Sequence, residues 1–264
     1  MSKIIDFHTH IYPQKIAAKA VASVAEYYTI PIIMDGTPET LINSGRHCGI
    51  GHFVVFSAAI DPDKVKTIND YIADECRTHS EFTGFGTLHP DFKNPQDEIE
   101  RIISLGLKGI KFHPDMQKFN IDDKQMFDTY AMLESRNLPV IFHTGDYRFP
   151  YSHPSRLANV LDNFPKLCAI AAHFGGWTLF DIAYDCLKEK KCYFDISSSI
   201  SHLGIRRAGE LIRAYGAERI LFGTDYPMWD PKECLKEFLQ IELSKTEQEL
   251  ILWKNAQKIL GIND

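Results

Sequence analysis

The feature that most constrains the fold of this chain is an alternation of short apolar runs with longer amphipathic segments, repeated about eight times in 264 residues. The runs are nearly continuously apolar, which is typical of parallel strands that are buried on both faces. Strands that alternate with helical segments indicate βαβ units, and about eight such units in a chain of this length predict a (β/α)8 TIM barrel. We expect the strands at residues 3–10, 52–57, 82–87, 108–112, 139–142, 167–172, 192–196 and 219–223.

No linker or low-complexity segment interrupts this pattern, so the whole chain, residues 1–264, is expected to be one domain. Helical spacing of apolar residues predicts helices over 14–28, 95–105 and 122–136, and a helical tail from about residue 231. Asp61 and Pro62 are expected to begin another helix, because Asp suits the N-cap and Pro the first helical position.

Composition excludes several classes of partner. The net charge of −6 gives no electrostatic reason to bind nucleic acid or an anionic membrane. No apolar run approaches the roughly 20 residues of a membrane helix, and the first residues do not have the pattern of a secretory signal. The six cysteines form no C-x-x-C pair, so we expect reduced thiols in a cytoplasmic protein.

Histidines and one aspartate follow the predicted strands. His8 and His10 lie two residues apart, so on one strand they point to the same side. His143, His173 and Asp225 directly follow three later strands. In a barrel the chemistry lies at the carboxyl ends of the strands, so imidazoles and a carboxylate are brought to one rim. This set of residue types predicts a site for Zn²⁺ or a similar divalent ion with a position left for water.

Each of these residues also has a simpler interpretation. His143 and His173 are also compatible with strand caps, Asp225 with the start of a turn, and Lys111 with a stem that packs in the barrel mouth. The joint pattern is much harder to explain in this way. Arg148 suits a bidentate pair with a substrate carboxylate, although a solvated loop arginine is an equal alternative.

The strand-end motifs together resemble the amidohydrolase superfamily, in particular the branch of short metal-dependent hydrolases related to aminocarboxymuconate-semialdehyde decarboxylase. The resemblance implies a TIM barrel with one divalent metal, usually zinc. It implies His8, His10, His143 and Asp225 as ligands, and His173 as the residue that orients or deprotonates the metal-bound water. The motifs are Asp6–His10, Gly109–Pro114, Val140–Gly145, Ala172–Gly176 and Gly223–Pro227.

Lys111 and His113 follow or end the fourth strand, two residues apart. Some members of the superfamily carry a carboxylated lysine on this strand that bridges two metals. The His113-Pro114 that follows Lys111 resembles the branch with one metal instead, so we expect Lys111 to face the substrate or to be structural. His113 is expected to contact the substrate.

The sequence therefore predicts an enzyme that uses a metal-activated water on a small amide, lactone or related substrate, with His173 and Asp225 in acid–base roles. The alternative is a non-oxidative decarboxylase of a small aromatic or unsaturated carboxylic acid. A non-catalytic metal-binding barrel is disfavoured, because His173, Lys111 and His113 are additional to a closed structural site. The expected partners are a small-molecule substrate and, since such barrels often pair, a second copy in a homodimer.

Overall fold

The chain, described here from a computed structural model, divides into two compact units. The structure describes residues 4–262, so Lys3 of the first expected strand lies outside the described part. The first unit comprises Met1–Ser57, Glu75–Thr83 and Ile196–Asp264, and the second comprises Ala58–Asp74 and Gly84–Asp195. Neither unit is one continuous stretch, because the chain passes back and forth between them. A single domain over residues 1–264 stays a prediction.

Every expected apolar run contains a strand, so the sequence-based assignment of strands is confirmed. One run is divided: residues 82–87 form two short strands separated by Phe85. The ring of Phe85 lies against the backbone of Gly109, where an added Cβ would come within 2.4 Å of it. The strands are β1 (Ile4–His10), β2 (Ile50–Phe56), β3 (Phe82–Gly84), β4 (Gly86–Thr87), β5 (Ile110–Phe112), β6 (Val140–Phe142), β7 (Ala169–Ala171), β8 (Tyr193–Asp195) and β9 (Ile220–Leu221).

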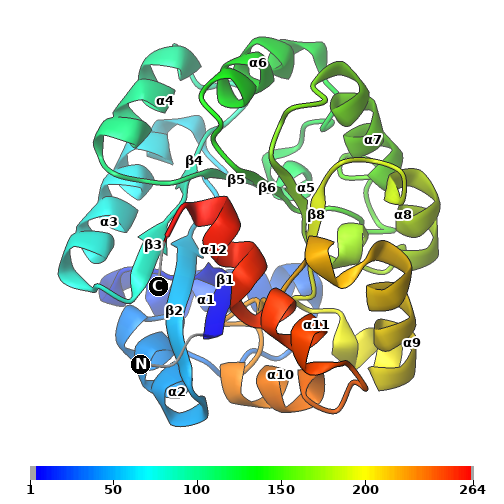
Figure 1. Cartoon of the computed structure of the whole chain (residues 1–264). Helices are drawn as coiled ribbons and strands as arrows, with labels where there is room; N and C mark the ends of the chain where they lie inside the picture. The colour runs from blue at the N-terminus through cyan, green and yellow to red at the C-terminus, as the bar shows by residue number, and fades with distance from the viewer. Residues whose placement is uncertain (1–3, 263–264) are drawn as a thin grey trace. The chain divides into compact units, whose positions relative to one another are not determined.

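In the first unit β1 is a central strand. It pairs in parallel with β2, from Ile4 opposite Ile50 to His10 opposite Phe56, and the two lie side by side (Figure 1). The segment that follows β9 runs along the other edge of β1, where the backbone N–H of His10 donates to the carbonyl of Tyr226 at 2.7 Å. Hydrogen bonding on both edges fixes the direction of the side chains that β1 carries.

In the second unit β4, β5, β6, β7 and β8 pair in this order, each parallel to the next. Sequential parallel order with a helical crossover between neighbours is the arrangement of βα-barrel strands. Phe112 and Phe142, from neighbouring strands, stack at 5.8 Å, and Tyr130 packs edge-on against both. This buried aromatic core fixes the carboxyl ends of β5 and β6.

The helices begin and end close to the expected positions. Asp61 accepts from the backbone N–H of Asp63 as predicted, whereas the helix expected from residue 122 begins later, because Asp123 first caps a short 3₁₀ turn. In the first unit lie α1 (Gln14–Tyr28), α2 (Pro38–Cys48), α9 (Ile200–Tyr215), η4 (Ala217–Arg219), α10 (Pro231–Phe238), α11 (Lys245–Glu249), η5 (Leu250–Lys254) and α12 (Asn255–Leu260). In the second lie η1 (Pro62–Lys64), α4 (Pro95–Ser104), α5 (Pro114–Gln117), η2 (Lys124–Met126), α6 (Phe127–Ser135), α7 (Pro154–Asn163), η3 (His173–Gly175) and α8 (Phe180–Leu187), while α3 (Val65–Thr78) has residues in both.

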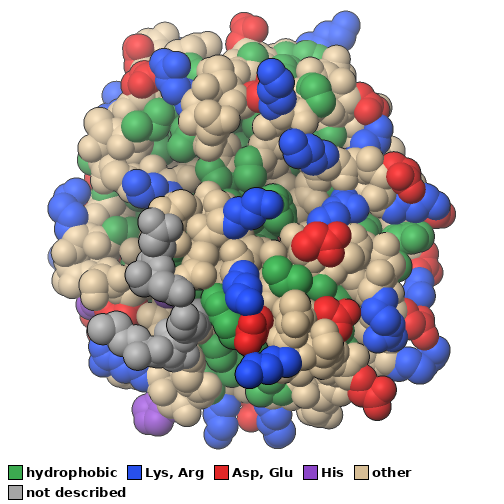
Figure 2. Space-filling view, viewed as in Figure 1, with side chains coloured by type: hydrophobic (Ala, Val, Ile, Leu, Met, Phe, Trp, Pro, Cys, Tyr) green, Lys and Arg blue, Asp and Glu red, His purple; other side chains and the backbone are tan. Residues whose placement is uncertain are grey.

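The surface agrees with the modest net charge. On the face that Figure 2 shows, basic and acidic side chains are interspersed. Across residues 4–262 no helix has both the length and the apolar character needed to cross a bilayer. The six cysteines all lie in the described part and form no disulfide there.

Candidate functional site

The strand-end residues form two clusters, one in each unit. The Asp225 cluster, in the first unit, comprises His8, His10, Ser197, Ser198 and Asp225. The His143 cluster, in the second unit, comprises His113, Asp115, His143, His173 and Asp195.

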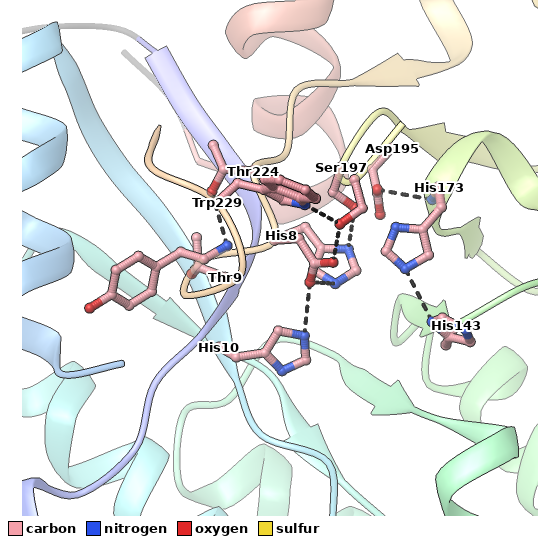
Figure 3. A network of polar contacts seen from close by, with 12 residues as sticks. His8, Thr9, His10, His143, His173, Asp195, Ser197, Thr224 and Trp229 are labelled. Atoms are coloured by element: carbon pink, nitrogen blue, oxygen red, sulfur yellow. Dashed lines mark hydrogen bonds and ion pairs between the residues drawn. The ribbon is translucent and has the colours of Figure 1, made fainter. Parts of the chain in front are cut away.

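In the Asp225 cluster two imidazoles converge on one carboxylate oxygen. Nε2 of His8 and Nε2 of His10 each lie 3.3 Å from Oδ1 of Asp225 (Figure 3). His8 is fully buried and Asp225 is buried, while the His10 side chain is 15% exposed. The edge of this cluster toward solvent is therefore at His10.

A buried carboxylate holds the two segments of the Asp225 cluster together. Asp6, on β1, accepts from the backbone N–H of Thr224 at 3.0 Å and from its hydroxyl at 2.6 Å. The same carboxylate accepts from the backbone N–H of His8 at 3.2 Å. The backbone N–H of Asp225 in turn donates to the carbonyl of His8 at 2.8 Å. Asp225 is thus positioned by β1, the strand that carries both histidines.

Two serines after β8 orient side chains of the Asp225 cluster. Ser197 Oγ lies 3.1 Å from Nδ1 of His8, which leaves Nε2 directed at Asp225 (Figure 3). Ser198 Oγ donates to Oδ2 of Asp225 at 2.5 Å, and the indole N–H of Trp229 donates to Ser198 Oγ at 2.8 Å. Both serines come shortly after the end of β8, so their hydroxyl groups lie at a strand end.

This donor set fits a divalent cation. Zinc lies about 2.0–2.2 Å from imidazole nitrogen and carboxylate oxygen, so in tetrahedral coordination neighbouring ligand atoms are about 3.3–3.6 Å apart. The two distances of 3.3 Å to Asp225 Oδ1 match that separation. Two imidazoles with one carboxylate are a common ligand set for zinc, iron and related ions.

In the His143 cluster the imidazoles contact one another. Nδ1 of His143, after β6, lies 3.1 Å from Nε2 of His173, after β7 (Figure 3). One of these two nitrogens must carry the hydrogen and the other must accept it. The ring of His113 stacks on that of His143, with centroids 4.0 Å apart and an interplanar angle of 10°. Nε2 of His143 is 3.5 Å from Oδ2 of Asp115.

Two carboxylates support these imidazoles. Asp115 lies on α5 and accepts from the backbone N–H and the hydroxyl of Ser152. Burial, with a smaller contribution from the charge of Asp146, raises the pKa of Asp115 to about 7, although the Ser152 hydrogen bonds oppose the shift. Asp195, at the end of β8, accepts from the backbone N–H of His173 at 3.2 Å. His173 itself has a φ of 59°, a conformation that non-glycine residues rarely adopt.

The predicted substrate contacts lie in the second unit. Lys111 is fully buried on β5. His113 caps α5, where its Nδ1 accepts from the backbone N–H of Met116 at 3.3 Å. The guanidinium of Arg148 donates from Nε and Nη2 to the buried carboxylate of Asp146, at 2.9 and 2.7 Å. The structure thus gives Arg148 a partner within the chain, and its role toward a substrate stays a prediction.

The sequence did not reveal the roles of four further residues, which belong to the two clusters or hold their side chains in place. Asp195 lies inside the predicted strand 192–196 and ends the shorter observed strand β8, so a criterion that takes the residue after each run does not select it. Asp6 lies two residues before His8 in the sequence, but its side chain accepts a hydrogen bond from Thr224, more than 200 residues away. Asp115 and Trp229 follow strand-end residues in the chain, and no pattern in the sequence shows where their side chains point.

Comparison with known proteins identifies the family and the fold of the chain. Residues 5–262 match the model of a protein family described as amidohydrolase. A solved structure, an uncharacterised TIM-barrel protein from Bordetella bronchiseptica, has a TM-score of 0.81 and 21% sequence identity, and the match covers 98% of each chain. The predicted (β/α)8 TIM-barrel fold and the predicted superfamily of enzymes are therefore confirmed.

Relatives with a named activity are decarboxylases. A γ-resorcylate decarboxylase from Polaromonas sp. (strain JS666 / ATCC BAA-500) is 27% identical over 130 residues, which are 42% of this chain and 40% of the relative. A dihydroxybenzoic acid decarboxylase from Polaromonas sp. JS666, solved with manganese and the inhibitor 2-nitroresorcinol, has a TM-score of 0.77 and 17% identity over 100% of this chain and 98% of its own. The prediction of a hydrolase as the main activity is wrong, because these relatives favour the alternative, a carboxy-lyase.

Proposed function

Because the chain belongs to the amidohydrolase family, we propose that it is a metal-dependent decarboxylase of a small aromatic carboxylic acid. The observation that carries the metal dependence is the convergence of His8 and His10 on one oxygen of Asp225, at 3.3 Å each. The class of reaction is supported by the relatives, which act on hydroxylated benzoates. The matched part spans only 40% of the curated relative, so activity and substrate are both part of the proposal.

We infer that the ion is held by His8, His10 and Asp225. The resemblance adds His143 as a fourth ligand, and this role stays a prediction because His143 lies in the other unit. Imidazole nitrogen favours zinc over manganese, so one Zn²⁺ is the proposed ion, although two structural neighbours contain manganese. Metal analysis of the purified protein distinguishes the two ions.

Decarboxylation breaks the bond between the ring carbon and the carboxylate carbon. The electron pair of that bond stays on the ring carbon, which gains one proton, and the carboxylate leaves as CO₂. A bound divalent ion supplies Lewis-acid stabilisation of negative charge on the substrate oxygens. The chain must therefore provide a proton and must hold the ring in place.

The hydrogen-bonded imidazoles of His143 and His173 are the groups proposed to hold and transfer the proton. Their ring nitrogens are 3.1 Å apart and share one hydrogen, so a proton on one ring affects the other. We assign the proton-carrying role to His173, with Asp225 as a second acid–base group. Lys111, His113 and Arg148 remain the proposed substrate contacts.

The direct test is release of CO₂. The protein is reconstituted with Zn²⁺ or Mn²⁺ and supplied with 2,6-dihydroxybenzoate, other hydroxybenzoates and benzoate. We expect CO₂ and loss of ultraviolet absorbance of the acid with at least one hydroxybenzoate, and none after removal of the metal. His8→Asn, which removes one ligand, is the matched variant and should release none. A metal-loaded protein that releases no CO₂ from any of these acids would contradict the decarboxylase.

A further inference from the structure

Two hydrogen bonds connect three side chains of the first unit: Trp229 donates to Ser198, and Ser198 donates to Asp225. We propose that Trp229 is a positioning residue for metal binding: through the hydroxyl of Ser198 its indole N–H fixes the carboxylate of Asp225, so that Oδ1 faces the two imidazoles. This inference rests on the metal site of the proposed function and is independent of the reaction that follows.

The chemistry of the three side chains decides which group donates in each of these two hydrogen bonds. Indole nitrogen is only a donor, so Ser198 Oγ accepts from Trp229. The single hydroxyl hydrogen of Ser198 then goes to Oδ2 of Asp225 at 2.5 Å, since an ionised carboxylate only accepts. The indole N–H occupies a lone pair of Ser198 Oγ and so fixes where this oxygen lies. Trp229 therefore holds Ser198 in the position from which its hydroxyl donates to Asp225.

The two carboxylate oxygens of Asp225 therefore have different partners at the proposed metal site. Oδ2 is held by Ser198, and Oδ1 alone lies 3.3 Å from Nε2 of His8 and of His10. Ser198 and Asp225 both have positive φ, 50° and 65°. Such conformations are unfavourable for residues other than glycine and are retained where the surroundings impose them. The short hydrogen bond thus joins two strained positions.

The position of the indole depends on this hydrogen bond, because packing surrounds it only in part. Trp229 borders a cavity of about 260 Å³ in the first unit, together with Ile200, Met228 and other side chains of that unit. Phenylalanine in place of Trp229 would keep an apolar wall and would remove the donor together with part of the ring volume. Trp229→Phe is therefore combined with Ser198→Ala, so that the contribution of the N–H group is separated from that of the lost volume.

The test is a double-mutant cycle of Mn²⁺ affinity, measured by calorimetry on the metal-free protein without substrate. Ser198→Ala is expected to weaken Mn²⁺ binding about 10- to 100-fold, as for other groups that orient metal ligands. Trp229→Phe should weaken it about 3- to 10-fold, the value of one hydrogen bond. In a protein that already carries Ser198→Ala, Trp229→Phe should have no further effect. Trp253→Phe, on η5, is the matched control and should bind like the wild type.

A readout that needs no metal is the indole N–H signal in ¹H–¹⁵N NMR. Trp229→Phe identifies the signal, which should exchange slowly in the wild type and should shift and exchange faster in Ser198→Ala. Equal Mn²⁺ affinity in Ser198→Ala, an additive effect of the two changes, or an unmoved indole signal would each overturn the inference. No uptake of either Mn²⁺ or Zn²⁺ by the wild type would overturn the metal site as well, whereas the expected affinities without CO₂ release would overturn only the decarboxylase.

Discussion

The two clusters use the same residue types in different ways. In the Asp225 cluster both imidazoles direct Nε2 at one carboxylate oxygen, and serine hydroxyls occupy the remaining polar atoms, Nδ1 of His8 and Oδ2 of Asp225. In the His143 cluster the imidazoles meet each other, one through a hydrogen bond and one through stacking.

Under the proposed function we assign the cation to the Asp225 cluster and the control of the proton to the His143 cluster. Atoms that converge on one point and have their other side fixed are suited to an ion. Ring nitrogens that face each other share a hydrogen, and the raised pKa of Asp115, about 7, means that this carboxyl also holds a proton near neutrality. The position of a residue after a strand is thus not enough to define its role; the neighbouring groups decide it.

The largest effect is expected from Asp225→Asn, which breaks the cation site. The amide keeps the shape and removes the charge on which both imidazoles converge. We expect loss of bound metal and a fall in kcat/KM of at least about 10⁴-fold, since Lewis-acid stabilisation is lost with the ion. Metal content and CO₂ release are the measurements. Asp91→Asn, at an exposed carboxylate, serves as the control, and metal retained in Asp225→Asn would refute the assignment.

The next largest effect is expected from His173→Asn, which tests the proton site. We expect kcat to fall about 10³-fold, within the usual range for loss of a general acid or base, while metal affinity changes less than about threefold. His47→Asn, at an exposed histidine of α2, should change neither quantity. If His173→Asn lost the metal as completely as Asp225→Asn, the separation of the two clusters by role would be wrong.

The fold could be predicted from the sequence because burial on both faces leaves a pattern that local residues reveal. Runs such as residues 139–142 are apolar at every position, and the structure has β6 there. Nothing within the third run indicates its interruption at Phe85, whose ring packs against Gly109, a residue more than 20 positions away.

For the candidate site, the sequence predicts which positions matter but not which side chains contact each other. Strand ends gave His8, His10, His143, His173 and Asp225, because chain position alone places them at the carboxyl end of a strand. Which imidazole faces a carboxylate and which faces another imidazole depends on side-chain contacts between distant segments. Ser198 with Asp225, and Asp115 with His143, are contacts of this kind.

A smaller effect concerns the proton on Asp115 in the metal-free protein. Because its pKa is about 7 in the folded state and 3.8 is the ordinary value, the folded protein holds more protons than the unfolded chain between these values. The free energy of unfolding should therefore decrease as pH rises, by roughly 2–3 kcal/mol between about pH 5 and pH 7 at 1.4 kcal/mol for each pKa unit.

Asp115→Asn should remove this slope. Denaturation in urea with a chelator present, at several pH values, gives the comparison with the wild type. Asp70→Asn, at an exposed carboxylate, should keep the wild-type slope. A slope that persisted unchanged in Asp115→Asn would mean that Asp115 is ionised throughout and that the His143 cluster does not store a proton there.

The smallest effect is expected from Arg148→Met, which asks whether the second unit also binds the substrate. Loss of the guanidinium leaves Asp146 buried without its charged partner, so we expect about 1–2 kcal/mol less stability, a modest value since the Arg148 side chain is 25% exposed. If Arg148 also contacts the substrate carboxylate, KM should rise about 3- to 10-fold with kcat nearly unchanged, because uniform binding is lost. Arg136→Met, in an exposed pair with Glu100, should change neither quantity. A fall in stability with an unchanged KM would mean that Arg148 only holds Asp146, and the second unit would then contribute proton control without this contact to the substrate.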